Sequence, residues 1–153
     1  RPILAEVQAL AAKSGFSSPR RMSTGVEFGR MAIIMAVLEK RLGMFFGTLD
    51  VYLNIVGGFR LDEPAGDLPV ALALCSCLLD KPIDEKLIAF VEVGLGGEVR
   101  SVTHLIQRVR EAERMGFETC IVPKQSLQTI DPAQYRMRLI GVSSLKQAVS
   151  VIA

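Results

Sequence analysis

Three cysteines and one histidine are the side chains best suited to metal binding or nucleophilic catalysis, but their spacing favours neither. Cys75, Cys77 and Cys120 do not form the paired arrangement of zinc ligands, and His104 is the single histidine among 153 residues. We therefore expect no metal site. We interpret the three cysteines as small apolar side chains in a reducing cytoplasm.

Glycines occur in three stretches that could cradle a phosphate, at 57–58, 94–97 and 116. None has the Gly-x-x-x-x-Gly-Lys-Ser/Thr arrangement, and none places Gly-x-Gly-x-x-Gly between a strand and a helix. These glycines are more simply explained by turns that need a positive φ. We expect no nucleotide or other cofactor to bind to this chain.

Carboxylates cluster directly before an Ala- and Leu-rich segment, at Asp62, Glu63 and Asp67. At the start of a helix, Asp67 is most simply an N-cap, which stabilises the helix by about 1 kcal/mol. His104 has no serine or cysteine clearly assigned to it, and spacing alone does not establish a catalytic triad.

The elements that must position these residues follow from the apolar periodicity. Alternation and short apolar runs predict strands, at 3–10, 50–58, 87–93, 98–102, 120–122 and 138–142. Apolar residues at intervals of three and four, with glycine or proline stops, predict helices at 27–42, 67–79 and 105–115 and a last helix, capped by Ser143, that reaches about residue 152. The Ser- and Gly-rich stretch 13–25 is expected to be a loop with solvated Arg20 and Arg21.

This order of elements predicts a mixed α/β fold, α+β-like, with two layers. The length is that of one domain, residues 1–153. The longest apolar runs, 31–38 and 69–79, are shorter than the roughly 18 residues that cross a bilayer, so we expect no membrane partner. The absence of an initiator Met and of a secretion signal indicates a cytoplasmic fragment of a longer protein.

The composition excludes intrinsic disorder, because half of the residues are apolar, 22% are charged and the mean hydropathy is +0.35. This is more apolar surface than a small monomer usually hides, which indicates a subunit interface. The net charge of +2 does not by itself indicate a nucleic-acid binder.

Three ordered motifs carry a family resemblance over nearly the whole chain. They are Phe59–Leu79 (FRLDEPAGDLPVALALCSCLL), Glu92–Arg100 (EVGLGGEVR) and Met115–Phe117 (MGF). Together they resemble the C-terminal domain of the RadA (Sms) family of bacterial DNA repair proteins. That domain is similar to the proteolytic domain of Lon, so the resemblance implies a Lon-like fold.

The resemblance also implies that a peptidase site has been lost. Lon-type enzymes use a Ser nucleophile in Gly-Pro-Ser-Ala-Gly and a Lys base in Gly-Gly-Leu-Lys-Glu-Lys. The matching segments here, 63–67 and 103–108, place Ala65 and Ile106 at those two positions. Neither side chain has a nucleophilic or basic atom, so we expect no peptidase activity. Two alternatives stay open: a peptidase that uses a displaced Ser76 or Ser101, and a module that only binds peptides.

Membership of this family implies a longer protein with a four-cysteine zinc motif and a RecA-like ATPase core, so that Zn, ATP and Mg would bind outside this chain. Such proteins are similar to hexameric motors that drive branch migration on DNA, with a recombinase as a further partner. The resemblance leaves self-assembly and DNA contact to this domain. Our candidates for DNA contact are basic side chains that could neutralise phosphates: Arg20, Arg21, Arg30, Arg60, Arg100 and Arg108.

Overall fold

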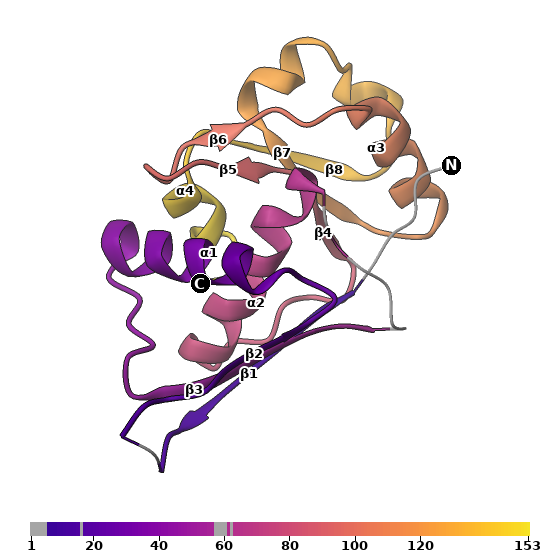
Figure 1. Cartoon of the computed structure of the whole chain (residues 1–153). Coiled ribbons are helices and arrows are strands. Elements are labelled where there is room, and N and C mark those ends of the chain that lie inside the picture. Colours follow the sequence, from indigo (N-terminus) through magenta and orange to yellow (C-terminus); the bar gives the residue numbers. More distant parts are fainter. Residues whose placement is uncertain (1–5, 16, 57–60, 62) are drawn as a thin grey trace.

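The computed structural model describes residues 6–15, 17–56, 61 and 63–153, and the expected α/β fold is confirmed. The strands are β1 (Val7–Lys13), β2 (Arg21–Thr24), β3 (Leu49–Ile55), β4 (Leu87–Ala89), β5 (Glu92–Val93), β6 (Val99–Arg100), β7 (Thr119–Pro123) and β8 (Arg138–Val142). The helices are α1 (Phe28–Leu42), α2 (Asp67–Leu79), α3 (Leu105–Arg114) and α4 (Leu145–Ser150), with 3-10 turns η2 (Pro64–Gly66), η3 (Lys124–Gln128) and η4 (Pro132–Gln134). Figure 1 shows α1 and α2 between the β1–β3 layer and the remaining strands.

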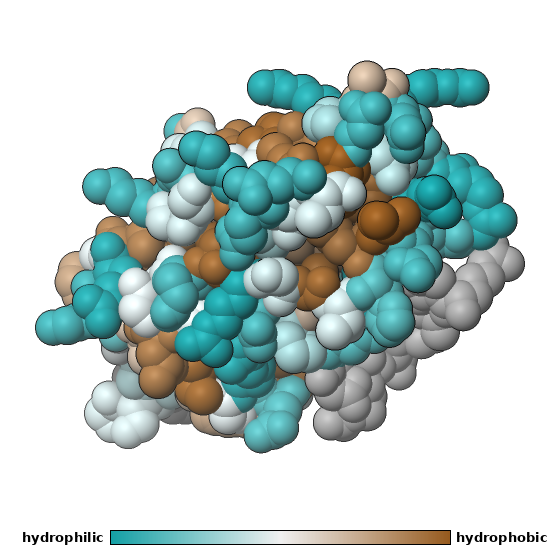
Figure 2. All heavy atoms as spheres, turned by 90° about the horizontal axis from the view of Figure 1, so that it is seen from above, coloured by the Kyte–Doolittle hydropathy of each residue, from teal (hydrophilic) through white to brown (hydrophobic). Residues whose placement is uncertain are grey.

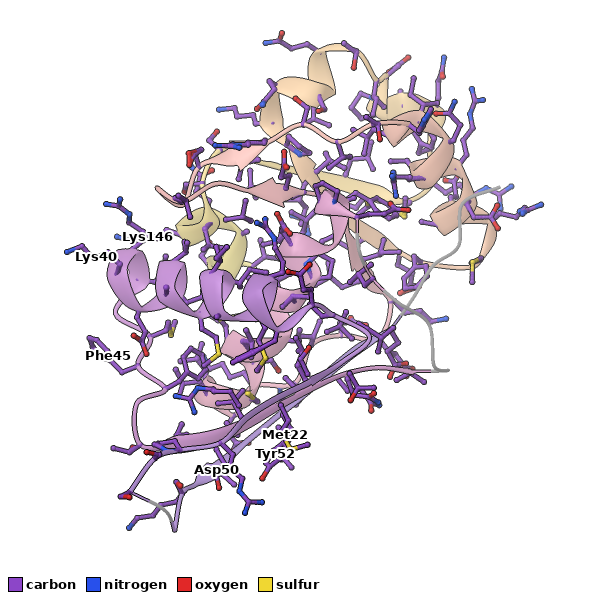
Figure 3. The ribbon with its side chains drawn as sticks, viewed as in Figure 1. Met22, Lys40, Phe45, Asp50, Tyr52 and Lys146 are labelled. Carbon is purple, nitrogen blue, oxygen red and sulfur yellow. The ribbon has the colours of Figure 1, made fainter. Side chains whose placement is uncertain are left out.

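The first sheet has the order β1-β3-β2, with β1 antiparallel and β2 parallel to the central strand β3. Alternation along β3 buries Val51, Leu53 and Ile55 in the core. The opposite face carries Tyr52, which lies in register with Leu10 of β1 and Met22 of β2. Figure 3 shows Met22 and Tyr52 on the side of this sheet that faces away from the helices.

The prediction of a loop over residues 13–25 is wrong at both ends of that segment. β1 continues to Lys13, and residues 21–24 form the parallel edge strand β2. Long-range contacts hold β2 in place, because the carboxylate of Asp50 accepts the backbone N–H of Arg20 at 2.7 Å and the guanidinium of Arg21 donates to the carbonyls of Phe46 and Leu49. The segment Arg-Met-Ser-Thr has no apolar alternation that could have predicted this pairing.

The expected single strand at 87–93 is also wrong, because the chain changes sheets within it. β4 joins the parallel sheet β4-β7-β8, whereas β5 forms a separate antiparallel hairpin with β6. Between them, the backbone N–H of Phe90 donates to Ile121, while that of Val91 donates to Ala65. The apolar run therefore serves two different sheets.

Helices α1 and α2 follow the predicted ranges closely. α1 ends at Leu42, and the φ of +69° at the following Gly43 allows the N–H of Met44 to donate to the carbonyl of Leu38 at 3.2 Å. The last helix differs from the prediction, since its N-cap is Ser144, not Ser143, and it ends at Ser150. The hydroxyl of Ser144 accepts the N–H of Gln147 at 3.1 Å.

Two apolar clusters share strand β7. Ile121 belongs to the larger cluster, with α1, α2, α4 and the first sheet, whereas Cys120 and Val122 belong to a smaller one with α3. Their alternation along β7 directs them to opposite faces of the second sheet. Within the described part of the chain, no helix is both long and apolar enough to cross a membrane.

Candidate functional site

The segment that precedes α2 forms the centre of the candidate site. The turn η2 contains Ala65 and Gly66, both buried, and α2 begins at the next residue. A Cβ on Gly66 would lie 2.6 Å from side-chain atoms of Leu61, so a larger residue would require the Leu61 side chain to move. The backbone of Val91 supports the turn from the other side: its N–H donates to the carbonyl of Ala65, and its carbonyl accepts from Leu68.

Asp67 is not the N-cap that its position predicts. Gly66 is the capping residue, and the carboxylate of Asp67, only 3% exposed, bonds outside its own helix. Nε of Arg30 donates to Oδ1 at 2.8 Å, Nη2 of Arg30 donates to Oδ2, and the N–H of Val93 donates to Oδ2 at 3.0 Å. The hydrogen bond to Asp67 raises the pKa of Arg30. This carboxylate thus joins α1, α2 and β5.

A second ion pair connects the same turn to α3. Nη1 of Arg108 lies 2.6 Å from Oε2 of Glu63, and Nε of Arg108 donates to the carbonyl of Thr103 at 2.8 Å. The Arg108 side chain is 15% exposed, so it lies largely within the protein. The pair brings together the neighbours of Ala65 and Ile106, which the resemblance to Lon-type enzymes had singled out.

A pocket of about 210 Å³ lies beside the Arg30–Asp67 pair. Its wall carries one guanidinium, from Arg30, and several carboxylates, from Glu27, Glu63, Asp67 and Glu92. Negative charge therefore predominates, which disfavours a phosphate at this position.

The side chains at the two compared positions offer no acid, base or nucleophile. Ala65 is buried, and Ile106 is a half-exposed aliphatic residue in the first turn of α3. The hydroxyl of Ser76 donates to the carbonyl of Lys81, beyond the end of α2. Ser101 is exposed after β6. The described residues contain no group of three His, Cys, Asp or Glu side chains that could hold a metal ion.

The cysteines differ in their environments. Cys75 and Cys120 are buried, and desolvation raises the pKa of each thiol to about 12. Cys77 is half-buried, and burial raises the pKa of its thiol as well. These shifts disfavour the reactive thiolate form.

The arginines that the sequence suggested for DNA contact do not form one patch. Arg30 and Arg108 bind carboxylates beside α2, and Arg100 is an exposed residue 3.9 Å from the carboxylate of Glu98. Arg21 binds backbone carbonyls, and the backbone of Arg20 binds Asp50, an interaction that lowers the pKa of that carboxyl. Arg60 lies outside the described residues.

Sequence reasoning missed the partner of Asp67 and a group of cations at the other end of α1. Arg30 lies 37 positions before Asp67, and no local pattern indicates such a pair. The cations are Lys40 and Arg41, in the last turn of α1, and Lys146, in α4. Lys40, Arg41 and Lys146 were not among the candidates for DNA contact that the sequence suggested.

The family model described as subunit ChlI of Mg-chelatase matches residues 30–126, which include both ion pairs. The chain is also similar to proteins named DNA repair protein RadA. Its identity is 44% to that of Streptococcus pyogenes serotype M3 over 99% of the chain, 43% to that of Halalkalibacterium halodurans over 99%, and 42% to that of Bacillus subtilis over 97%. The matches cover 33%, 33% and 32% of those proteins, so the chain spans about a third of their length.

Proposed function

Since this chain belongs to the family that the ChlI model describes and is 44% identical along its length to a DNA repair protein RadA, we propose that it is a non-proteolytic domain of a DNA repair and recombination protein. Its roles are self-assembly and DNA binding. The observation that carries this proposal is the identity of 42–44% to RadA proteins over nearly the whole chain.

The loss of proteolysis is supported by the two positions that resemble the Lon dyad. Ala65 supplies a buried methyl group and Ile106 an aliphatic chain, and neither can attack a carbonyl or accept a proton. The ion pairs Arg30–Asp67 and Arg108–Glu63 occupy the surroundings of that turn. A Lon-like fold without peptidase chemistry accounts for this combination.

Self-assembly is supported by apolar side chains that reach the surface. Exposed examples include Leu10, Met22 and Phe28. Figure 2 shows apolar residues open to solvent between hydrophilic ones on one face of the molecule. Burying such surface between subunits is favourable, and the resemblance to RadA makes a homohexamer the assembly that we propose.

The parent protein, in this proposal, is a cytoplasmic DNA-dependent ATPase that drives branch migration together with a recombinase. Its zinc motif and its ATP and Mg sites belong to regions beyond this third of the length of the relatives. The domain described here would hold the subunits together and contact the DNA on which the motor acts.

Two other functions remain distinguishable from this one by experiment. A peptidase with a displaced nucleophile would need Ser76 or Ser101, but the Ser76 hydroxyl is bonded to the backbone carbonyl of Lys81, which is not a base. A peptide-binding module would keep the acidic pocket beside Arg30 as its cleft.

The test combines three measurements on the 153-residue chain. Binding of fluorescent duplex DNA is titrated between about 50 and 200 mM salt, light scattering reports the assembly state, and a fluorogenic peptide reports proteolysis. We expect DNA affinity that falls steeply with salt and no peptide turnover. Peptide cleavage, or an assembled protein without affinity for DNA, would contradict the proposal.

A further inference from the structure

A side chain that contacts DNA phosphate must have its charge available. Arg30, Arg100 and Arg108 each lie beside a carboxylate, and the guanidinium of Arg21 donates to backbone carbonyls. A phosphate would have to displace these internal partners. Arg21, Arg30, Arg100 and Arg108 are therefore poorly suited to be the main contacts.

Lys40, Arg41 and Lys146 differ from those arginines. All three are exposed, and their side chains form no ion pair or hydrogen bond with any residue that the structure describes. We call them the α1–α4 cation group.

Gly97 connects the two helices that carry this group. The position of a Cβ on Gly97 would lie 3.5 Å from Cγ of Arg41 and 4.0 Å from Cβ of Leu145, the residue before Lys146. The N–H of Leu145 also donates to the carbonyl of Gly97 at 2.9 Å. Figure 3 shows Lys40 and Lys146 extending from α1 and α4 toward the same side of the molecule.

Two carboxylates lie near the group, and both have other partners. Oε1 of Glu39 accepts the N–H of Phe46 at 3.2 Å. Glu98 accepts the N–H of Gly96 at 3.0 Å and lies 3.9 Å from Arg100. Both carboxylates keep their negative charge, but the three cations together with Arg100 outnumber them, so the surroundings of the α1–α4 cation group are net positive.

An exposed aromatic ring lies in the loop that follows α1. Phe46 is fully buried and anchors the loop after α1, whereas the neighbouring Phe45 is 70% exposed. Figure 3 shows Phe45 on the same side of the molecule as Lys40. The loop thus presents an exposed apolar side chain on the side of the molecule that carries Lys40.

Helix electrostatics explains only part of this arrangement. Cations in the last turn of α1 stabilise the negative end of that helix, which accounts for Lys40 and Arg41. Lys146 lies in the first turn of α4, where a cation gains no such stabilisation. The helix dipole therefore does not account for the presence of Lys146.

We propose that Lys40, Arg41, Lys146 and Phe45 form the surface with which this domain contacts duplex DNA. This inference rests on the DNA-binding role proposed above and assigns that role to residues other than the six arginines. The three cations contact backbone phosphates without reading sequence, and Phe45 packs against the sugar edge of a groove.

The test compares two variants with the same change in net charge. One combines Lys40→Gln, Arg41→Gln and Lys146→Gln, and the change at Arg41 retains the Cβ and Cγ atoms that pack on Gly97. The control is Lys81→Gln, Lys86→Gln, Lys124→Gln, which alters exposed lysines on other segments. Circular dichroism checks that both variants fold. If the first variant is unstable, the double variant Lys40→Gln, Lys146→Gln replaces it in the comparison.

We expect the first variant to bind duplex DNA at least about tenfold more weakly at low salt, with a slope of log affinity against log salt reduced by about 2.7. The control should keep the parental slope. Phe45→Ala should lower affinity while it leaves the slope unchanged, because it removes no charge.

The outcomes separate this inference from the proposed function. If the parent binds DNA and the two charge variants lose affinity equally, the surface is wrong while the DNA-binding role stands. If the parent binds no DNA, the role itself fails. Polyglutamate binding that depends on the α1–α4 cation group, without DNA binding, would assign the surface to an acidic protein partner and overturn the inference.

Discussion

Arg30 in the first turn of α1 and Asp67 in the first turn of α2 form a two-pronged ion pair in which the carboxylate is only 3% exposed. The same carboxylate accepts the N–H of Val93. A buried carboxylate with three donors is favourable only as long as the donors remain, because removal of one partner leaves a desolvated charge.

Replacing Arg30 with Met should therefore lower the free energy of unfolding by about 2–3 kcal/mol, somewhat below the range for fully buried pairs since the Arg30 side chain is 36% exposed. Urea denaturation followed by circular dichroism measures this change. The matched control is Arg100→Met, which removes an exposed partner 3.9 Å from Glu98 and should cost less than about 1 kcal/mol. Equal losses in the free energy of unfolding for the two variants would show that the buried Arg30–Asp67 pair stabilises the protein no more than the exposed pair.

Arg21 has a structural role that its sequence context did not indicate. Its guanidinium donates to the carbonyls of Phe46 and Leu49 and so ties the edge strand β2 to the start of β3 and to the segment before it. Arg21→Met should lower the free energy of unfolding by about 1.5–3 kcal/mol in urea denaturation, since two carbonyls lose a charged donor. Arg21→Lys should recover only part of this, because an ammonium lacks the guanidinium fork. Full recovery with Lys would mean that charge alone matters.

Whether an element could be predicted from the sequence depends on whether the interactions that form it are local or long-range. Local signals were sufficient for α1 and α2, whose apolar spacing and stop signals lie within each helix. They were insufficient for β2, which depends on Asp50 and on carbonyls 25 and 28 residues away from Arg21. They also failed at 87–93, where consecutive residues hydrogen-bond to Ile121 and Ala65 in separate parts of the fold.

The candidate site shows the same limit. The resemblance to Lon-type enzymes singled out Ala65 and Ile106, and the Arg108–Glu63 pair brings their neighbours together. The role of Asp67 could not be predicted, because an aspartate at a helix start is compatible with capping and with a tertiary ion pair alike. Its partner Arg30 was identified as a basic residue, but its pairing required the fold.

The end of α1 depends on a backbone conformation that favours glycine. Gly43 has a φ of +69°, and no atom lies within 4 Å of the point that a Cβ would occupy, so strain rather than collision opposes a side chain there. Gly43→Ala should lower the free energy of unfolding by about 1 kcal/mol, and Gly43→Asn by less. Gly47→Ala is the control, because its Cβ would also meet open space and its φ lies outside the left-handed range. Thermal unfolding of the variants compares the two, and a loss for Gly47→Ala as large as for Gly43→Ala would contradict the argument.

The buried thiols of Cys75 and Cys120 make stability depend on alkaline pH. Their pKa values are raised to about 12, from 9.0 for a free thiol, because burial penalises the thiolate. Well below pH 9 both thiols are neutral whether the chain is folded or unfolded, so they add no pH dependence. Between about pH 9 and 12 the unfolded chain loses these protons while the folded chain keeps them, and the free energy of unfolding falls.

Each thiol should contribute a slope of up to about 1.4 kcal/mol per pH unit in that interval. Urea denaturation at a series of pH values from about 8 to about 11 measures the slope. Cys75→Ala with Cys120→Val should flatten it, because this variant lacks both buried thiols. Cys77→Ser, at the half-buried position, should leave most of the slope in place. An unchanged slope in the Cys75 and Cys120 variant would show that other groups cause the alkaline loss of stability.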